Sequence, residues 1–129
     1  MAADKTELPD EQPVIRTVPQ PSDLNLNGNV FGGWILSQMD IAGGHMARRV
    51  AKGPVATVAV DKMKFYQPIN VGDTVSIYAE IQRVGTTSVA IELEVYAEGD
   101  HGSVVRQVTE GCFVFVAVGK DGRPRPIEK

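Results

Sequence analysis

Residues 25–40 read NLNGNVFGGWILSQMD, and this stretch decides the fold. It begins as a polar loop that ends at paired glycines, Gly32 and Gly33. From there on, apolar residues recur at the spacing of one helix face, namely Ile35, Met39, Ala42 and Met46. The dipeptide Gly53-Pro54 is a typical helix stop. The stretch therefore predicts a loop that enters one long helix over about residues 32–52.

Strands are predicted on both sides of this helix. A short β-branched run at 13–18 lies between two prolines and favours an edge strand. Four longer runs follow the helix, at 55–65, 74–84, 88–97 and 104–118. The second and third alternate apolar and polar residues on either side of a hairpin turn at Gly85-Thr86. These runs predict an α+β fold, in which an antiparallel sheet carries the single helix on one face.

Two details of these elements carry further expectations. The first half of 55–65 is almost continuously apolar, so we expect this strand to be central and covered on both faces. Gly43 and Gly44 interrupt the helix at a cost of about 1 kcal/mol each relative to alanine. A close approach of another backbone or of a ligand would explain them, and close packing on the sheet is the favoured explanation.

Composition and charge limit the classes of function. A chain of 129 residues with 43% hydrophobic residues suits one domain, which we place at 13–129 after a flexible tail at 1–12. A net charge of −3 argues against a nucleic-acid partner. No apolar run approaches the ~20 residues of a membrane span, and residues 1–11 lack a signal-peptide core. Because Cys112 is the only cysteine, a reducing compartment fits, and we expect a cytoplasmic protein.

Three features could carry chemistry. Backbone N–H groups at Gly32 and Gly33 would lack helical partners and could polarise a carbonyl oxygen, unless Asn29 simply caps an ordinary helix start. Asp40 lies at the border of the apolar stripe with no basic residue three or four positions away, so an ion pair within the helix does not explain it. A solvent-facing aspartate is the alternative. Asn25 could hold a water or a carbonyl oxygen, or serve only its turn.

Other candidate groups are weaker. His45 and His101 have no metal-ligand spacing, so no metal site is expected. Ser37 lacks the context of a nucleophilic serine, and Cys112 fits a core position. The basic tail near Arg123 is either a solvated end or a phosphate contact.

The residues also carry a family resemblance. The segments PSDLNLNGNVFGGW at 21–34 and MDIAGG at 39–44 resemble the hotdog-fold acyl-CoA thioesterases, most closely those of the bacterial YciA type, which are related to mammalian cytosolic acyl-CoA hydrolases. Further matches are TVAVD at 57–61, VGD at 71–73, GTTS at 85–88 and GRPRP at 122–126. The resemblance spans about residues 14–127, and the combined motif is specific although each piece alone is not.

The resemblance implies a hotdog fold, in which a curved antiparallel sheet wraps around one long helix. It implies hydrolysis of acyl-CoA thioesters of short to medium chain length. Asp40 would be the general base or nucleophile, Asn25 would assist from the loop, and the backbone at Gly32 and Gly33 would polarise the thioester carbonyl. It also implies a homodimer with sites at its interface, assembled into a homohexamer as a trimer of dimers.

Coenzyme A is part of the substrate and product, and no separate cofactor is implied. The resemblance and the charges together suggest the residues that would contact coenzyme A: Lys62, Lys64, Gly85, Thr87, Ser88, Arg123 and Arg125.

The same fold is compatible with two other functions. A non-catalytic acyl-CoA-binding protein is the main alternative, but the chain keeps both Asp40 and Asn25. Sensors of this kind usually carry a DNA-binding segment, and about 12 residues before the first predicted strand are too few for one. A hydratase would need a paired histidine and aspartate, whereas His45 lies about 140° around the helix from Asp40.

Overall fold

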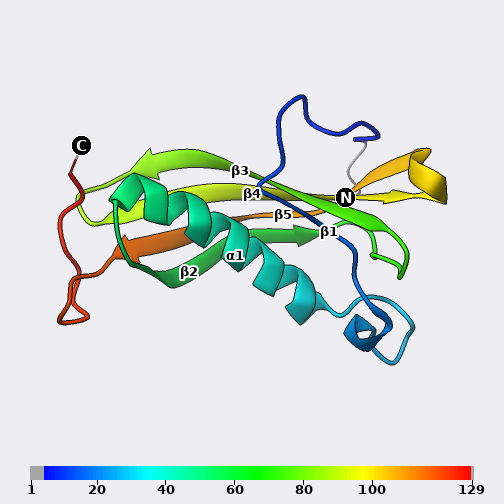
Figure 1. Ribbon diagram of the computed structural model, residues 1–129, viewed down its shortest axis with the longest axis horizontal. Helices are drawn as coiled ribbons and strands as arrows, with labels where there is room; N and C mark the ends of the chain where they lie inside the picture. The colour runs from blue at the N-terminus through cyan, green and yellow to red at the C-terminus, as the bar shows by residue number, and fades with distance from the viewer. Residues whose placement is uncertain (1–4, 129) are drawn as a thin grey trace.

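The computed structural model describes residues 5–128 and consists of one long helix on a five-stranded sheet (Figure 1). The elements in chain order are β1 (Ile15–Thr17), α1 (Gly32–Ala51), β2 (Val55–Phe65), β3 (Thr74–Val84), β4 (Ser88–Gly99) and β5 (Val104–Ala117). Short 3-10 turns span Pro21–Asp23 and Asp100–Gly102. Every strand pairs antiparallel to its neighbours, in the order β1-β3-β4-β5-β2. The predicted α+β architecture and the edge position of the first strand are confirmed.

The helix ends where the sequence predicts. Lys52 adopts a left-handed conformation, with φ of 58°, and its backbone N–H donates to the carbonyl of Arg48. Arg125, from the segment after the last strand, donates from Nη2 to the carbonyl oxygen of Ala51 at 3.0 Å. A cation at this end also suits the helix dipole. The C-terminus of α1 is thus closed by its own backbone and by a residue far along the chain.

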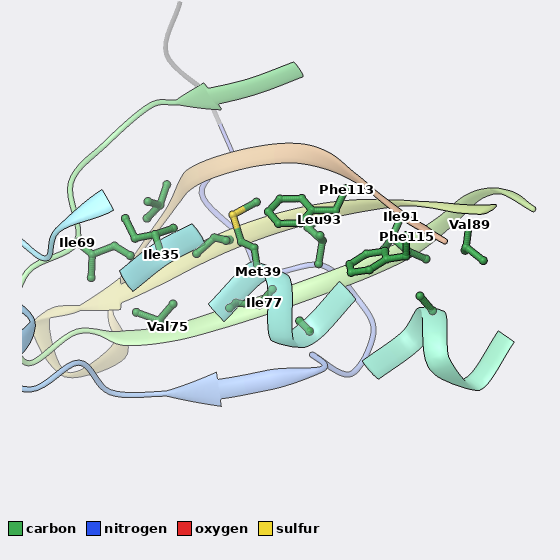
Figure 2. Close-up of a cluster of buried hydrophobic side chains, with 14 of the residues drawn as sticks. Ile35, Met39, Ile69, Val75, Ile77, Val89, Ile91, Leu93, Phe113 and Phe115 are labelled. Carbon is green, nitrogen blue, oxygen red and sulfur yellow. The ribbon is translucent and has the colours of Figure 1, made fainter. Parts of the chain in front are cut away.

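The apolar stripe of α1 packs on the inner face of the sheet. Ile35, Met39 and Ala42 are buried, and Figure 2 shows Met39 reaching toward Leu93 and Phe113. The alternating residues of β4 that the sequence predicts to be apolar and inward are all fully buried: Val89, Ile91, Leu93 and Val95.

Gly43 marks the closest approach of the helix to the sheet. A Cβ built at this position would lie 2.9 Å from the ring of Phe115 and 3.1 Å from Leu93 Cδ1, closer than side chains pack. Gly44 is less constrained, because a Cβ there would lie 3.6 Å from the same ring, which is ordinary contact. Packing on the sheet therefore explains Gly43, as expected.

The prediction that β2 is a central, fully covered strand is wrong for the single chain. β2 is the outer strand beyond β5, and Val58 and Val60 on it are 56% and 46% exposed. A run of apolar residues predicts burial, but it does not say whether the cover comes from the same chain. Here an eleven-residue edge remains open, and such an edge invites pairing with another chain.

The opposite face of the sheet is polar but only partly exposed. Tyr78 and Tyr96 are buried there in an edge-to-face contact with ring centroids 5.6 Å apart. Burial and the neighbouring carboxylate of Glu94 raise the pKa of Tyr96 to about 12. Lys5 donates from Nζ to that carboxylate at 2.8 Å. Residues 1–4 lie outside the described residues, and the flexibility of the tail at 1–12 stays a prediction.

The close contact at Gly43 can be tested against its neighbour. We expect Gly43→Ala to lower the free energy of unfolding by up to about 2 kcal/mol, because overpacking costs roughly 1–3 kcal/mol and the helix-propensity gain of about 1 kcal/mol offsets only part of it. Gly44→Ala is the matched control and should be neutral or stabilising. Urea unfolding of both variants measures the difference, and equal effects at the two positions would contradict the assigned contact.

Candidate active site

The Asn25 side chain organises the loop before the helix. Its Oδ1 accepts hydrogen bonds from the backbone N–H groups of Asn27 at 2.8 Å and Asn29 at 3.2 Å. The backbone of Asn25 also bonds across the loop, with its N–H donating to the carbonyl of Asn29 and its carbonyl accepting from Gly28. Because only the amide oxygen can accept from two N–H groups, the orientation of the carboxamide is fixed. Nδ2 is then the group that can donate to a ligand.

The helix start is open, which is necessary if its backbone N–H groups are to polarise a carbonyl oxygen. The residue preceding the helix, Phe31, provides no side-chain cap. The alternative in which Asn29 caps the helix is wrong, because its side chain donates to Asn70 Oδ1 at 3.2 Å instead. No described residue forms a hydrogen bond to the backbone N–H of Gly32 or Gly33, and a Cβ at Gly32 would meet nothing within 4 Å. Two donors at the positive end of the helix dipole thus remain accessible.

Asn25 and Gly32 share one hollow of about 340 Å³, which we call the Asn25 hollow. Its wall also includes Asn29, Phe65 and Gln67. The hollow therefore brings the fixed carboxamide and the open helix start to one place.

Asp40 lies in a second hollow, of about 280 Å³, which we call the Asp40 hollow. Asp40 is half-buried and Thr57 is exposed, and Asp40 Oδ1 accepts a hydrogen bond from Thr57 Oγ1 at 2.5 Å. The carboxylate is therefore partnered rather than fully solvated, and its catalytic role stays a prediction. The residues that line the Asp40 hollow are Leu36, Ser37, Asp40, Thr57, Val60 and Phe113.

Thr57 is the residue that sequence reasoning missed as a member of the site. The sequence places it in the matching segment at 57–61 but indicates no partner for it. The available signal was its position as the one hydroxyl in the apolar first half of β2. That it reaches Asp40 depends on how β2 lies beside α1, which a linear pattern does not give.

The two hollows have no lining residue in common. Gly32 and Asp40 are eight residues apart on one helix, which corresponds to about 12 Å along its axis. A single chain therefore presents a donor group and a carboxylate group that do not face one carbonyl.

The residues expected to contact coenzyme A fall into two groups. Lys62 and Lys64 lie on β2 and line a hollow with Glu92 and Cys112, on the sheet face opposite α1. The second group comprises the β3–β4 turn and the C-terminal segment: Gly85, Thr87, Ser88, Arg123 and Arg125. The turn is closed by a hydrogen bond from Gly85 N–H to the Ser88 carbonyl, and the two segments are joined by one from Ile127 N–H to the Thr86 carbonyl.

Arg125 differs from the other members of this set. It is half-buried, and its Nε and Nη2 already donate to the carbonyls of Val118 and Ala51. Arg123 is exposed in the same segment. A structural role accounts for Arg125, and its contact with coenzyme A stays a prediction.

Within residues 5–128, no group of three metal-ligating side chains could hold an ion. Over the same residues, no helix has the length and apolar character needed to cross a membrane.

Comparisons with known proteins agree on one family. A family model described as the thioesterase superfamily matches residues 27–104. The acyl-CoA thioester hydrolase YciA of Escherichia coli is 44% identical over 126 residues, which cover 94% of this chain and 96% of that protein.

Solved structures give the same result. The hexameric hotdog-fold thioesterase Cj0915 of Campylobacter jejuni superposes with a TM-score of 0.85 at 40% identity, covering 92% of this chain and 91% of that chain. The hexameric broad-specificity acyl-coenzyme A thioesterase HI0827, in an aspartate-to-alanine variant, gives a TM-score of 0.87 at 42% identity, covering 91% and 86%. The expected hotdog fold is thereby confirmed.

The Asn25 loop allows a test that separates its two roles. We expect Asn25→Ala to lower the free energy of unfolding by about 1 kcal/mol, because two backbone N–H groups lose Asn25 Oδ1 as their acceptor and must bond to water instead. Asn25→Asp should be close to wild type in stability, since a carboxylate oxygen still accepts both bonds. Urea unfolding with matched slopes measures both, and an equal loss in the two variants would contradict the acceptor role.

Proposed function

This chain belongs to the thioesterase superfamily and is an acyl-CoA thioester hydrolase, and we propose that Asp40 activates the attack on the thioester while the Asn25 hollow stabilises the oxyanion. The observation that carries this assignment is that Thr57 holds the carboxylate of the half-buried Asp40 in an otherwise largely apolar hollow. The proposed substrates are acyl-CoA thioesters of short to medium chain length.

The carboxylate supports two routes. As a general base, Asp40 takes a proton from water on Oδ2 while the oxygen attacks the thioester carbonyl; the C–S bond then breaks, and the proton passes to the sulfur of the leaving coenzyme A. As a nucleophile, Asp40 itself attacks, expels the thiolate and forms an anhydride that water hydrolyses. In both routes Thr57 occupies Oδ1 and so orients the carboxylate.

The oxyanion needs donors that are in place before the reaction. The backbone N–H groups of Gly32 and Gly33 have no partner among the described residues, and they lie at the positive end of the helix dipole. Asn25 adds Nδ2, whose orientation is set by the loop. Removing one such donor typically costs about 10²–10³ in kcat.

We propose that the two half-sites meet across a homodimer. The open edge of β2 exposes Val58, Val60 and Phe65, and Ile41 on the adjoining helix is 57% exposed. Pairing this edge with that of a second copy would cover these side chains and place the Asn25 hollow of one chain against Asp40 of the other. Because the two solved structures named above are hexamers, the proposed assembly is a homohexamer built from three such dimers.

The proposal extends to the coenzyme A contacts and to the location of the protein. Coenzyme A would be contacted by the exposed cations Lys62, Lys64 and Arg123 and by the turn at 85–88. It enters as substrate and leaves as product, and no other cofactor is proposed. A cytoplasmic location is proposed because the single Cys112 has no disulfide partner in the sequence.

Substitutions at Asp40 and Thr57 test the proposed roles. We expect Asp40→Asn to lower kcat by about 10²–10⁴, as for the loss of a general base. Thr57→Val should lower kcat by a smaller factor of about tenfold, because the carboxylate stays but loses the hydrogen bond that orients it. Thr57→Ser keeps the hydroxyl and should retain activity. Release of free coenzyme A measures all three.

Two outcomes would overturn these roles. An unchanged kcat in Asp40→Asn would remove Asp40 from the chemistry. Tight acyl-CoA binding by the wild type without turnover would favour the non-catalytic alternative.

Mixing inactive subunits tests the shared site. Asp40→Ala and Asn25→Ala proteins should each be nearly inactive alone, but unfolding and refolding them together should restore about a quarter of wild-type activity. Half of randomly assembled dimers are mixed, and each mixed dimer holds one intact site of two. A mixture as inactive as its components would show that both groups act from one chain.

A further inference from the structure

The Asp40 hollow has a polar end and an apolar end. Asp40 and Thr57 form the polar end. Leu36, one helical turn before Asp40 on the same face of α1, lies with Val60 and Phe113 at the other end. Ser37 adds no free donor, because its hydroxyl donates to the carbonyl of Trp34 at 2.8 Å. The hollow thus offers an apolar surface that begins next to the carboxylate.

Phe113 forms the floor of this hollow. Val60 on β2 lies directly opposite Phe113 on β5 in the strand register, and Leu36 comes from α1. The hollow is therefore a cleft between the helix and the edge strand, closed below by a residue of the next strand. Phe113 is 1% exposed, so its ring belongs to the core while one side contributes to the cleft.

This floor cannot easily yield to a longer ligand. The ring of Phe113 stacks on that of Phe115, with centroids 6.4 Å apart and planes 24° apart. Phe115 in turn lies against Gly43, where no space remains for even one added carbon. A side chain backed in this way is held in place, because close-packed interiors transmit strain rather than absorb it.

The Asn25 hollow is a poorer fit for an alkyl chain. Beside apolar residues such as Ile35 and Phe65, its wall carries Asn25, Asn29, Tyr66 and Gln67, which offer amide and hydroxyl groups that the Asp40 hollow lacks beyond its polar end. The pantetheine arm of coenzyme A contains amide groups that such a wall can bind. The pantetheine part of the thioester therefore suits the Asn25 hollow, and the acyl chain suits the Asp40 hollow.

We propose that the Asp40 hollow binds the acyl chain and that Phe113, with Leu36 as the side wall, sets its maximum length. The inference rests on the proposed function and specifies its substrate. The hollow of about 280 Å³ offers three apolar side chains, Leu36, Val60 and Phe113, to an alkyl chain. Each methylene that the hollow buries contributes a factor of about four to kcat/KM, and a methylene that exceeds the floor contributes nothing.

The test measures kcat/KM for saturated acyl-CoAs of increasing length, each divided by the value of the same variant for acetyl-CoA. Phe113→Leu and Leu36→Ala should shift the optimum to longer chains, with a gain of about fourfold for each added methylene accommodated. Leu36→Phe should shift it to shorter chains. If Leu36→Ala and Leu36→Phe shift the preferred chain length in opposite directions, Leu36 is a wall of the pocket, because general damage to the core would not reverse with side-chain size.

Two matched controls complete the test. Val50→Ala removes a partly buried side chain from the same helix outside this hollow, and it should leave the profile unchanged. Phe65→Ala alters the Asn25 hollow and should also leave the profile unchanged. Size-exclusion chromatography checks that all variants assemble as the wild type does.

The results separate this inference from the function beneath it. Hydrolysis by the wild type with a profile unaffected by the Leu36 and Phe113 variants, or shifted by Phe65→Ala instead, would overturn the acyl-chain assignment alone. Absence of hydrolysis by the wild type would overturn the proposed function together with it.

Discussion

The contact of α1 with Phe115 and Leu93 at Gly43 is the constraint on which the rest of the structure depends. It brings the helix as close to the sheet as a backbone can come, and so fixes which side chains are buried. Met39 then points into the core, and Asp40, the next residue, is left at the border beside β2. The same helix carries the open N–H groups of Gly32 and Gly33 at its start. One tight packing contact thus helps determine where both chemical groups of the site are presented.

The chain uses an incomplete surface to make a complete site. Thr57 on β2 donates a hydrogen bond to Asp40. The same strand is the last one of the sheet, and its apolar residues Val58 and Val60 are exposed. An edge of this kind is a liability for a monomer, because its unpaired backbone groups favour association. In an assembly that covers the edge, the same feature aligns two half-sites that are separated within one chain. Burial, assembly and catalysis are then governed by a single strand.

Much of this could be predicted from the sequence, because the helix and the hairpin strands have strong and regular periods. Their bounds, the edge position of β1 and the tight packing of the helix on the sheet all followed from local pattern. The position of β2 did not, because apolar residues indicate burial without saying which chain buries them. The role of Thr57 depends on the spacing between α1 and β2. The alternative in which Asn29 caps the helix is not realised: its side chain donates to Asn70, 41 residues later, and no side chain caps the helix start. Contacts between distant segments leave no mark in a linear pattern.

The Asn25 carboxamide has a consequence for which side chains position 25 can hold. Its oxygen shapes the loop by accepting two backbone hydrogen bonds, and its nitrogen remains for the ligand. Aspartate retains the first capacity and loses the second, serine and threonine offer one hydroxyl for both tasks, and glutamine places the amide one carbon further out. Loop shape and ligand binding are therefore encoded in one functional group, so neither can be altered at this position by a side chain that keeps the other. A designer seeking to retune the donor would have to rebuild the loop first.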